Sequence, residues 1–344
     1  MRTLRLLPLL LLSLPAVAYE TDQLVGRHKP IDSGLAIANA RVDELLRTAV
    51  ERTNKKTSCK GSDERTRRVL ATEIDKLFSP STYVSNRGQW EDGLGFGAYT
   101  AWLEMSEVDR LTFLDRSDIY GALRPAESMI VSAVGVCSTI ELAGVRLGTD
   151  KTDHFWAQGY QYERKSKWGK KPEKAVDWGT KTEFGHYGLL TSTVFSFADL
   201  HANWRGFQFY QGLLGRESVV QRGEDGCAAV VGKFDWKDWV DDGMDEVLNP
   251  SYLPEVVEES VRKRLQADKA AICEGFDTWG ADYEARRDRV IHETVNEYTV
   301  DAPKRVDQLG LVELCAPSTR PDVASAGAPN PTVGAAAGAV PVEP

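Results

Sequence analysis

The sequence predicts a mainly α-helical, irregular globular domain that carries one small β-hairpin. Apolar residues recur at intervals of three and four in several separate stretches, which is typical of amphipathic helices. A single short stretch alternates apolar and polar residues around Ala143-Gly144, which is typical of a hairpin. With 42% hydrophobic residues and nine tryptophans, the 344-residue chain can bury a large core.

Two helices are expected first along the chain. The apolar positions between Leu35 and Ala49 predict one helix, with Ser33 as its N-cap. The second helix follows Ser62 and is stopped by Pro80. The glycine-rich stretch at 86–97 is expected to be a loop, because it lacks the features of a phosphate-binding fingerprint.

The hairpin and the later helices follow. Residues 140–147 alternate around the Ala-Gly pair and should form the hairpin. The Asn-Pro pair that ends at Pro250 marks a turn, and Pro254 suits the first turn of a helix. A further amphipathic segment surrounds Val290 to Val295. We therefore expect one helical domain over residues 19–315.

Both ends of the chain differ from this domain. Residues 1–18 combine Arg2 and Arg5, a short apolar run and a small-x-small site, which is typical of a secretory signal peptide. Residues 316–344 are rich in Ala, Pro and Gly without periodicity, and we expect them to be disordered. No later segment is long and apolar enough for a transmembrane helix. These features predict a protein that is periplasmic or secreted.

Charge and cysteine content narrow the class of protein further. The formal net charge is −9 and becomes −11 without the signal segment, whose charged residues are two arginines, so nucleic acid is not an expected partner. This charge remains compatible with an envelope component or a small molecule as the partner. Five scattered cysteines lack a C-x-x-C spacing and suggest two disulfides with one thiol left over, in a pairing that the spacing does not select.

Polar residues at helical spacing gather between Gly148 and Tyr210. Asp150 and His154 are four apart, Glu183 and His186 are three apart, and Asp199 is followed by Asn203 at four. Aromatic residues surround these stripes, so buried members must find partners or surround a ligand. The stripes and their flanks supply further candidates for the same polar cluster: Lys151, Arg205 and Tyr210.

Three interpretations of this cluster remain open. His154, His186 and Asp150, helped by Glu183 or Asp199, could hold a divalent transition metal in a hydrolase, although the cofactor is not identified by the spacing. Without metal, Glu183 and Asp199 could act as acid and base on an envelope glycan. The third interpretation, slightly favoured, is a non-catalytic envelope protein with an internal polar network. Locally, Asp150 and Asp199 also fit helix-capping patterns.

The chain also resembles a group of exported proteins. Gly148-Thr-Asp-Lys-x-x-His-Phe, and Ser196-x-Ala-Asp-Leu-x-Ala-Asn203 after Phe195, resemble patterns in uncharacterised exported proteins of Gram-negative bacteria. The segments Tyr19-Glu-Thr-Asp-Gln and Asp245-Glu-x-x-Asn-Pro250 fit the same resemblance. It implies export and one domain, and it implies no particular activity.

Overall fold

The protein is described by a computed structural model over residues 20–79, 97–112, 119–120, 123, 127, 137–185, 187–190, 192–293, 295–304, 306 and 308–315. The signal segment, the C-terminal tail and most of the glycine-rich loop lie outside these residues. The described part is mainly helical with two small antiparallel hairpins, which confirms the predicted fold class.

The N-terminal helices form an antiparallel pair whose ends follow local sequence signals. The first part of the fold consists of α1 (Leu35–Thr57), α2 (Asp63–Phe78) and α3 (Ala98–Met105). The second helix follows Ser62, as predicted, and Ser62 caps α2 by accepting a hydrogen bond from the backbone N–H of Arg65. Gly34 rather than Ser33 precedes α1, so that expected N-cap is displaced by one residue.

The predicted hairpin leads directly into the middle of the fold. It consists of β1 (Thr139–Leu142) and β2 (Val145–Gly148). Ala143 and Gly144 have φ angles of 57° and 82°, which a two-residue hairpin turn with positive φ requires. One continuous helical segment follows at once and is made of α5 (Asp150–Asp153), the π-helix η3 (His154–Gln158) and α6 (Gly159–Lys165).

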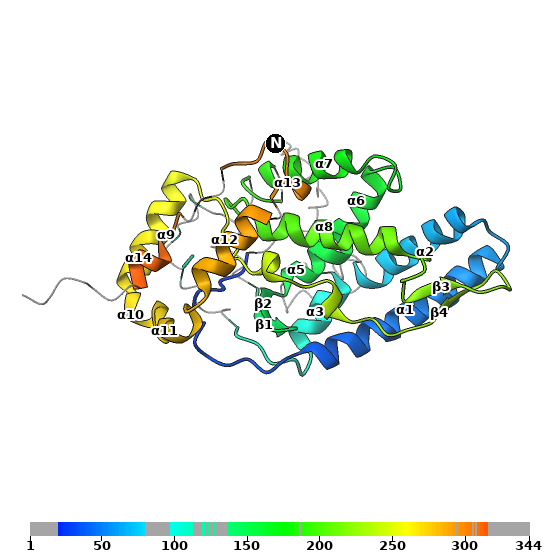
Figure 1. Ribbon diagram of the computed structural model, residues 1–344, viewed down its shortest axis with the longest axis horizontal. Helices are drawn as coiled ribbons and strands as arrows, with labels where there is room; N and C mark the ends of the chain where they lie inside the picture. Colours follow the sequence, from blue (N-terminus) through cyan, green and yellow to red (C-terminus); the bar gives the residue numbers. More distant parts are fainter. Residues whose placement is uncertain are drawn as a thin grey trace, which may run out of the picture.

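Helix α8 occupies the centre of the molecule (Figure 1). In Figure 1, α1, α2 and the second hairpin lie at one end of it, and the C-terminal helices lie at the other. The elements that follow α6 are α7 (Pro172–Phe184), α8 (Phe197–Gly212), β3 (Val220–Arg222), β4 (Ala228–Val230), and the 3-10 turns η4 (Trp236–Asp238) and η5 (Asp242–Met244). The C-terminal part consists of α9 (Glu255–Ala267), α10 (Lys269–Ile272), α11 (Phe276–Trp279), α12 (Tyr283–Glu293), α13 (Val295–Tyr298) and α14 (Leu311–Cys315).

An aromatic core lies between α8 and the N-terminal helices. Its largest buried members include Trp156, Trp236 and Tyr99. The indole N–H of Trp236 donates to the Tyr99 hydroxyl at 3.0 Å, whereas the indole N–H of Trp156 has no hydrogen-bond partner within the described residues. A second apolar cluster joins the C-terminal helices to the segment that follows η5. The polar site described below lies where α5 and α8 meet that segment.

Helix α8 and the π-helix cross at very short distance because a glycine stands at the crossing. A Cβ atom on Gly206 would lie 1.9 Å from the carbonyl oxygen of Phe155, and one on Gly159 would lie 2.6 Å from the carbonyl carbon of Gly206. The backbone of the neighbouring helix thus approaches Gly206 more closely than any side chain would allow.

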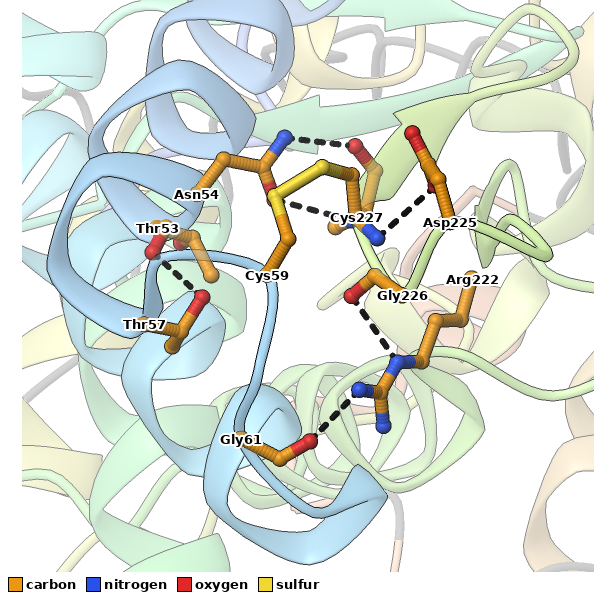
Figure 2. The surroundings of a disulfide bond; sticks show 10 residues. Thr53, Asn54, Thr57, Cys59, Gly61, Arg222, Asp225, Gly226 and Cys227 are labelled. Atoms are coloured by element: carbon orange, nitrogen blue, oxygen red, sulfur yellow. Dashed lines mark hydrogen bonds between the residues drawn. A yellow bond between two sulfur atoms is a disulfide. The ribbon is translucent and has the colours of Figure 1, made fainter.

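Two disulfides, Cys59–Cys227 and Cys273–Cys315, and the buried thiol of Cys137 match the predicted cysteine inventory. Cys59–Cys227 joins the α1–α2 turn to the β3–β4 hairpin across 168 residues of sequence, and Figure 2 shows the hydrogen bonds around it. Two structural disulfides fit a chain that folds in an oxidising compartment. Among the described residues, no helix combines the length and apolarity that crossing a membrane requires.

Candidate functional site

A fully buried lysine is the centre of the polar cluster. Lys151, in α5, has no solvent-exposed surface. Its ammonium nitrogen lies 2.7 Å from Asp150 Oδ2, 2.6 Å from Asp199 Oδ1 and 2.5 Å from Glu246 Oε1. The ammonium group donates hydrogen bonds to Asp150 and Glu246 and forms a close ion pair with Asp199. Burial opposes its charge, but these carboxyl groups outweigh burial and raise the pKa of Lys151.

Four separate segments build this arrangement. The β-hairpin delivers Asp150 and Lys151 at the start of α5, and the first turn of α8 supplies Asp199. The Ser196 hydroxyl accepts a hydrogen bond from the backbone N–H of Asp199, which is the predicted cap. Because the Ser196 side chain caps the helix, the carboxylate of Asp199 is not needed as a cap and faces Lys151 instead. The segment after η5 supplies Glu246, and the N-terminal segment supplies Thr21, whose hydroxyl donates to Asp150 Oδ1 at 2.8 Å.

Asp150 does not have the capping role that its sequence pattern suggested. Thr149 precedes α5, and no side chain caps that helix end. Both oxygens of the Asp150 carboxylate are engaged in tertiary contacts, one with Thr21 and one with Lys151. Asp150 is therefore part of the polar cluster rather than a local helix cap.

His154 joins the cluster through Asp199. Its Nε2 lies 3.1 Å from Asp199 Oδ2, and its Nδ1 lies 3.0 Å from the side-chain amide of Asn203. Burial disfavours the charged imidazole, but the charge of Asp199 and its hydrogen bond outweigh burial and raise the pKa of His154 to about 9.

The Asn203 amide opposes this protonation. The atom that faces His154 also lies 3.2 Å from the backbone carbonyl oxygens of His154 and Asp199, so it must be the nitrogen. In this orientation Nδ1 accepts a hydrogen bond, and the imidazole proton sits on Nε2, toward Asp199. This is the tautomer that we assign to the neutral imidazole, because the backbone holds both carbonyl groups in place. Protonation of Nδ1 would require the amide to turn.

Three glutamates near Lys151 hold protons more strongly than exposed glutamates do. Burial, followed by the charge of Asp199, raises the pKa of Glu183 to about 8. Burial also raises the pKa of Glu246 to about 8, despite the nearby ammonium group. The pKa of Glu20 is raised well above its usual value by burial and by Glu246. By contrast, burial is outweighed at Asp199, where His154 and Lys151 lower the pKa.

The charge balance of the cluster follows from these shifts. Lys151 has close ion pairs with Asp150 and Asp199, and further ionised carboxylates would lack a positive partner. An unpaired buried charge costs on the order of 3–5 kcal/mol. The three glutamates are therefore protonated near neutral pH. The cluster therefore contains buried carboxyl groups that can release a proton.

Glu246 connects this cluster to a cavity. Its side chain is 7% exposed, and it lines a cavity of about 40 Å³ that has room for a few water molecules. Gln23 and Ser251 also line the cavity. Gln23 Oε1 accepts the backbone N–H of Glu246 at 2.6 Å, while Gln23 Nε2 and Ser251 Oγ are buried and have no hydrogen-bond partner within the described residues. The cavity is thus bordered by an acid, whereas these two unsatisfied polar atoms are themselves covered by protein.

The cluster contains three groups of the kind that bind metals, but their arrangement does not fit a metal centre. Asp150, His154 and Asp199 each offer a ligand atom, and these atoms lie within 4.8 Å of one another. The ammonium group of Lys151 already lies against both carboxylates. A divalent ion bound there would meet this positive charge at short range, and the imidazole Nε2 is engaged with Asp199.

The remaining predicted site residues are placed differently. Glu183 lies near the cluster, where its Oε1 accepts the backbone N–H of Ser196 at 2.9 Å. Arg205 donates to backbone carbonyls of the η4 region, and Tyr210 donates to the carbonyl of Trp156 in the aromatic core. These two residues do not belong to the site. His186 lies outside the described residues.

Sequence spacing alone pointed to five of the residues that meet here, Asp150, Lys151, His154, Asp199 and Asn203. It missed Glu20 and Glu246, although both stand in segments that carry the resemblance to exported proteins. No family model, curated protein or solved structure matches this chain. The function must therefore be argued from the site itself.

Proposed function

We propose that the protein is an exported, metal-independent acid–base enzyme in which the Glu246 carboxyl exchanges a proton with a substrate in the adjoining cavity. One observation carries the proposal: Glu246 contacts the buried ammonium group of Lys151 and also lines the cavity. A carboxyl group that is protonated near neutral pH is suited to act as a general acid.

The surrounding residues assign the other roles. After Glu246 gives up its proton, Lys151 stabilises the carboxylate that remains, since it lies 2.5 Å away. Asp199 and Asp150 hold Lys151 in place. Gln23 Oε1 accepts the backbone N–H of Glu246 and holds this segment beside the cavity. The cavity has room only for a small reacting group of the substrate together with water. We propose hydrolysis, in which Glu246 protonates the leaving group as its bond breaks and a water molecule attacks in its place. The proton that this water loses returns to the Glu246 carboxylate.

Glu183 and Asp199 are less suitable as the reacting pair. Glu183 is 2% exposed and Asp199 is fully buried, so a glycan chain has no access to either carboxyl group. Asp199 is engaged with both Lys151 and His154, which suits a counter-ion rather than a proton donor.

The proposed location of the enzyme is the bacterial envelope or the medium. The N-terminal segment has the pattern of a signal peptide, and two disulfides suit an oxidising compartment. The resemblance to exported proteins of Gram-negative bacteria supports the same placement.

The test compares the Glu246→Gln variant with the wild type on a panel of chromogenic esters, glycosides and amides. Turnover should decrease as the pH rises through about 8, and the variant should lose roughly 100-fold or more in rate, as expected for a lost general acid. The Gln side chain can still accept a hydrogen bond from Lys151, so the melting temperature should change little. The Glu259→Gln variant, at an exposed carboxylate of α9, is the matched control.

A readout that needs no substrate accompanies this test. Difference infrared spectra of the wild type should contain protonated carboxyl absorption that disappears as the pH rises through about 8. Glu246→Gln should lose the Glu246 part of this absorption and keep the part that belongs to Glu183. Turnover that survives in this variant would refute the assignment. A wild type without turnover on the whole panel would instead favour the non-catalytic polar network.

A further inference from the structure

A groove with three arginines lies on the surface next to the segment that supplies Glu246. Its walls include Arg27, Arg146 and Arg286, together with Trp279, Asp245 and Asp282. The protein as a whole has a net charge of −9, so a group of three guanidinium ions is a local exception. The ion pairs within the groove show which of these charges are compensated.

Two of the arginines have carboxylate partners. Arg27 and Asp245 form a bidentate pair, in which Arg27 Nη1 lies 3.0 Å from Asp245 Oδ1, and both side chains are buried. Arg286 binds both oxygens of Asp242, at 2.6 and 3.1 Å. Asp282 is largely exposed and only approaches Arg286, at 4.0 Å. These pairs leave one guanidinium charge in the groove without a close partner.

That charge belongs to Arg146 in β2. Its terminal nitrogens donate to the backbone carbonyl oxygens of Gly26 and Lys29, which fix the guanidinium group in the wall of the groove. Within the described residues, no carboxylate lies within 4.0 Å of it. Burial, followed by the neighbouring charge of Arg27, lowers the pKa of Arg146. The charges of Asp245, which pairs with Arg27, and of Glu141 oppose this lowering, but neither carboxylate contacts Arg146, so a bound anion could still compensate the Arg146 charge.

We infer that this groove is a binding site for a small oxyanion group, a phosphate or a carboxylate, held by Arg146 with Arg27 and Arg286. A guanidinium group has five N–H donors, and Arg146 uses two of them on backbone carbonyl oxygens, so others remain to donate to such an anion. The ring of Trp279, whose centroid lies 5.8 Å from the Arg27 guanidinium carbon, forms an apolar wall beside the anion. This inference does not depend on the proposed activity at Glu246.

The experiment measures the binding of inorganic phosphate and of acetate by isothermal titration calorimetry, with sodium chloride used to keep the ionic strength constant. We expect saturable binding to the wild type. The Arg146→Gln variant should bind roughly tenfold more weakly, because one charge-assisted contact is lost. The Arg146→Lys variant, which keeps the charge but loses the planar guanidinium group, should fall between the two.

The matched control is Arg41→Gln. Arg41 also lies over a tryptophan ring, 5.5 Å from the centroid of Trp102, but it has its own carboxylate partner in Glu44 at 2.6 Å. Binding to this variant should equal binding to the wild type. Tighter binding of phosphate would identify a phosphate ligand, and tighter binding of acetate would identify a carboxylate ligand.

The indole N–H resonance of Trp279 gives a second readout on the wild type, so the test does not depend on variants that fold. Its assignment comes from a Trp279→Phe variant, and the resonance should shift on addition of the anion while the other indole resonances stay in place. Chloride alone should produce no saturable shift. The inference is overturned if neither anion binds saturably, or if Arg146→Gln and Arg41→Gln weaken binding equally.

Discussion

Replacement of Glu183 by glutamine should make the stability of the protein less sensitive to alkaline pH. Burial raises the pKa of Glu183 from 4.5 to about 8, so the folded protein holds this proton more tightly than the unfolded chain does. The resulting stabilisation is fully present below the unfolded pKa and is lost as the pH rises through the folded pKa. Glutamine is neutral throughout and can still accept the backbone N–H of Ser196.

The size of the effect follows from the two pKa values. Each unit of pKa difference corresponds to about 1.4 kcal/mol, so the wild type should lose about 4 kcal/mol between about pH 5 and about pH 9 through this group alone. The free energy of unfolding of Glu183→Gln should therefore increase, relative to that of the wild type, by about that amount over the same interval. Near pH 5 the two proteins should differ little, because Glu183 is then protonated in the folded state.

Urea unfolding of both proteins at a series of pH values provides the measurement. The Glu173→Gln variant is the matched control, because Glu173 is exposed in the first turn of the same helix, α7. Its difference from the wild type should be nearly independent of pH over this interval. If the Glu183→Gln difference changes by less than about 1 kcal/mol, Glu183 is not a proton-holding carboxyl group and the charge balance of the cluster is wrong.

Three further outcomes follow from the contacts of the site. Lys151→Met should lose about 3–5 kcal/mol of unfolding free energy at neutral pH, because it leaves buried carboxylates without a cation; urea unfolding equal to the wild type would contradict this. Gly206→Ala should melt at a much lower temperature in circular dichroism, since its Cβ would lie 1.9 Å from Phe155 O, whereas Gly212→Ala in the same helix has open space and should not. Added zinc or manganese should leave the melting temperature of the wild type unchanged, because an ammonium group lies against the candidate ligands; a stabilisation that is lost in His154→Ala would instead support a metal centre.

Local patterns predicted much of the secondary structure. The Ser62 cap, the hairpin at Ala143-Gly144 and the helix that follows Pro254 depend on residues within a few positions of one another. Ser33 shows the limit of such signals, because its hydroxyl lies 3.4 Å from the backbone N–H of Leu35 although Gly34 is the N-cap. A one-residue shift changes few contacts, so the pattern does not distinguish the two positions.

The candidate site was predictable only where its members share a helix. Spacings of four residues placed Asp150 with His154 and Asp199 with Asn203. The same reasoning failed for Tyr210, because eleven residues of helix separate it from Asp199 by about 16 Å, beyond the reach of one site. Glu246 comes from a segment 95 residues after Lys151, and spacing contains no information on such a contact.

The sequence by itself determined the helical class, the hairpin, the cysteine inventory and the polar character of the central stretch, because short-range periodicity and composition govern these properties. Tertiary structure alone decided that Lys151 is the centre of the cluster, that Glu246 faces a cavity and that Arg146 has no carboxylate partner among the residues that the structure describes. It also decided the charges, since the pKa of a carboxyl group depends on burial and on neighbours that folding brings together from distant parts of the chain. The chemistry proposed for this protein depends on those charges.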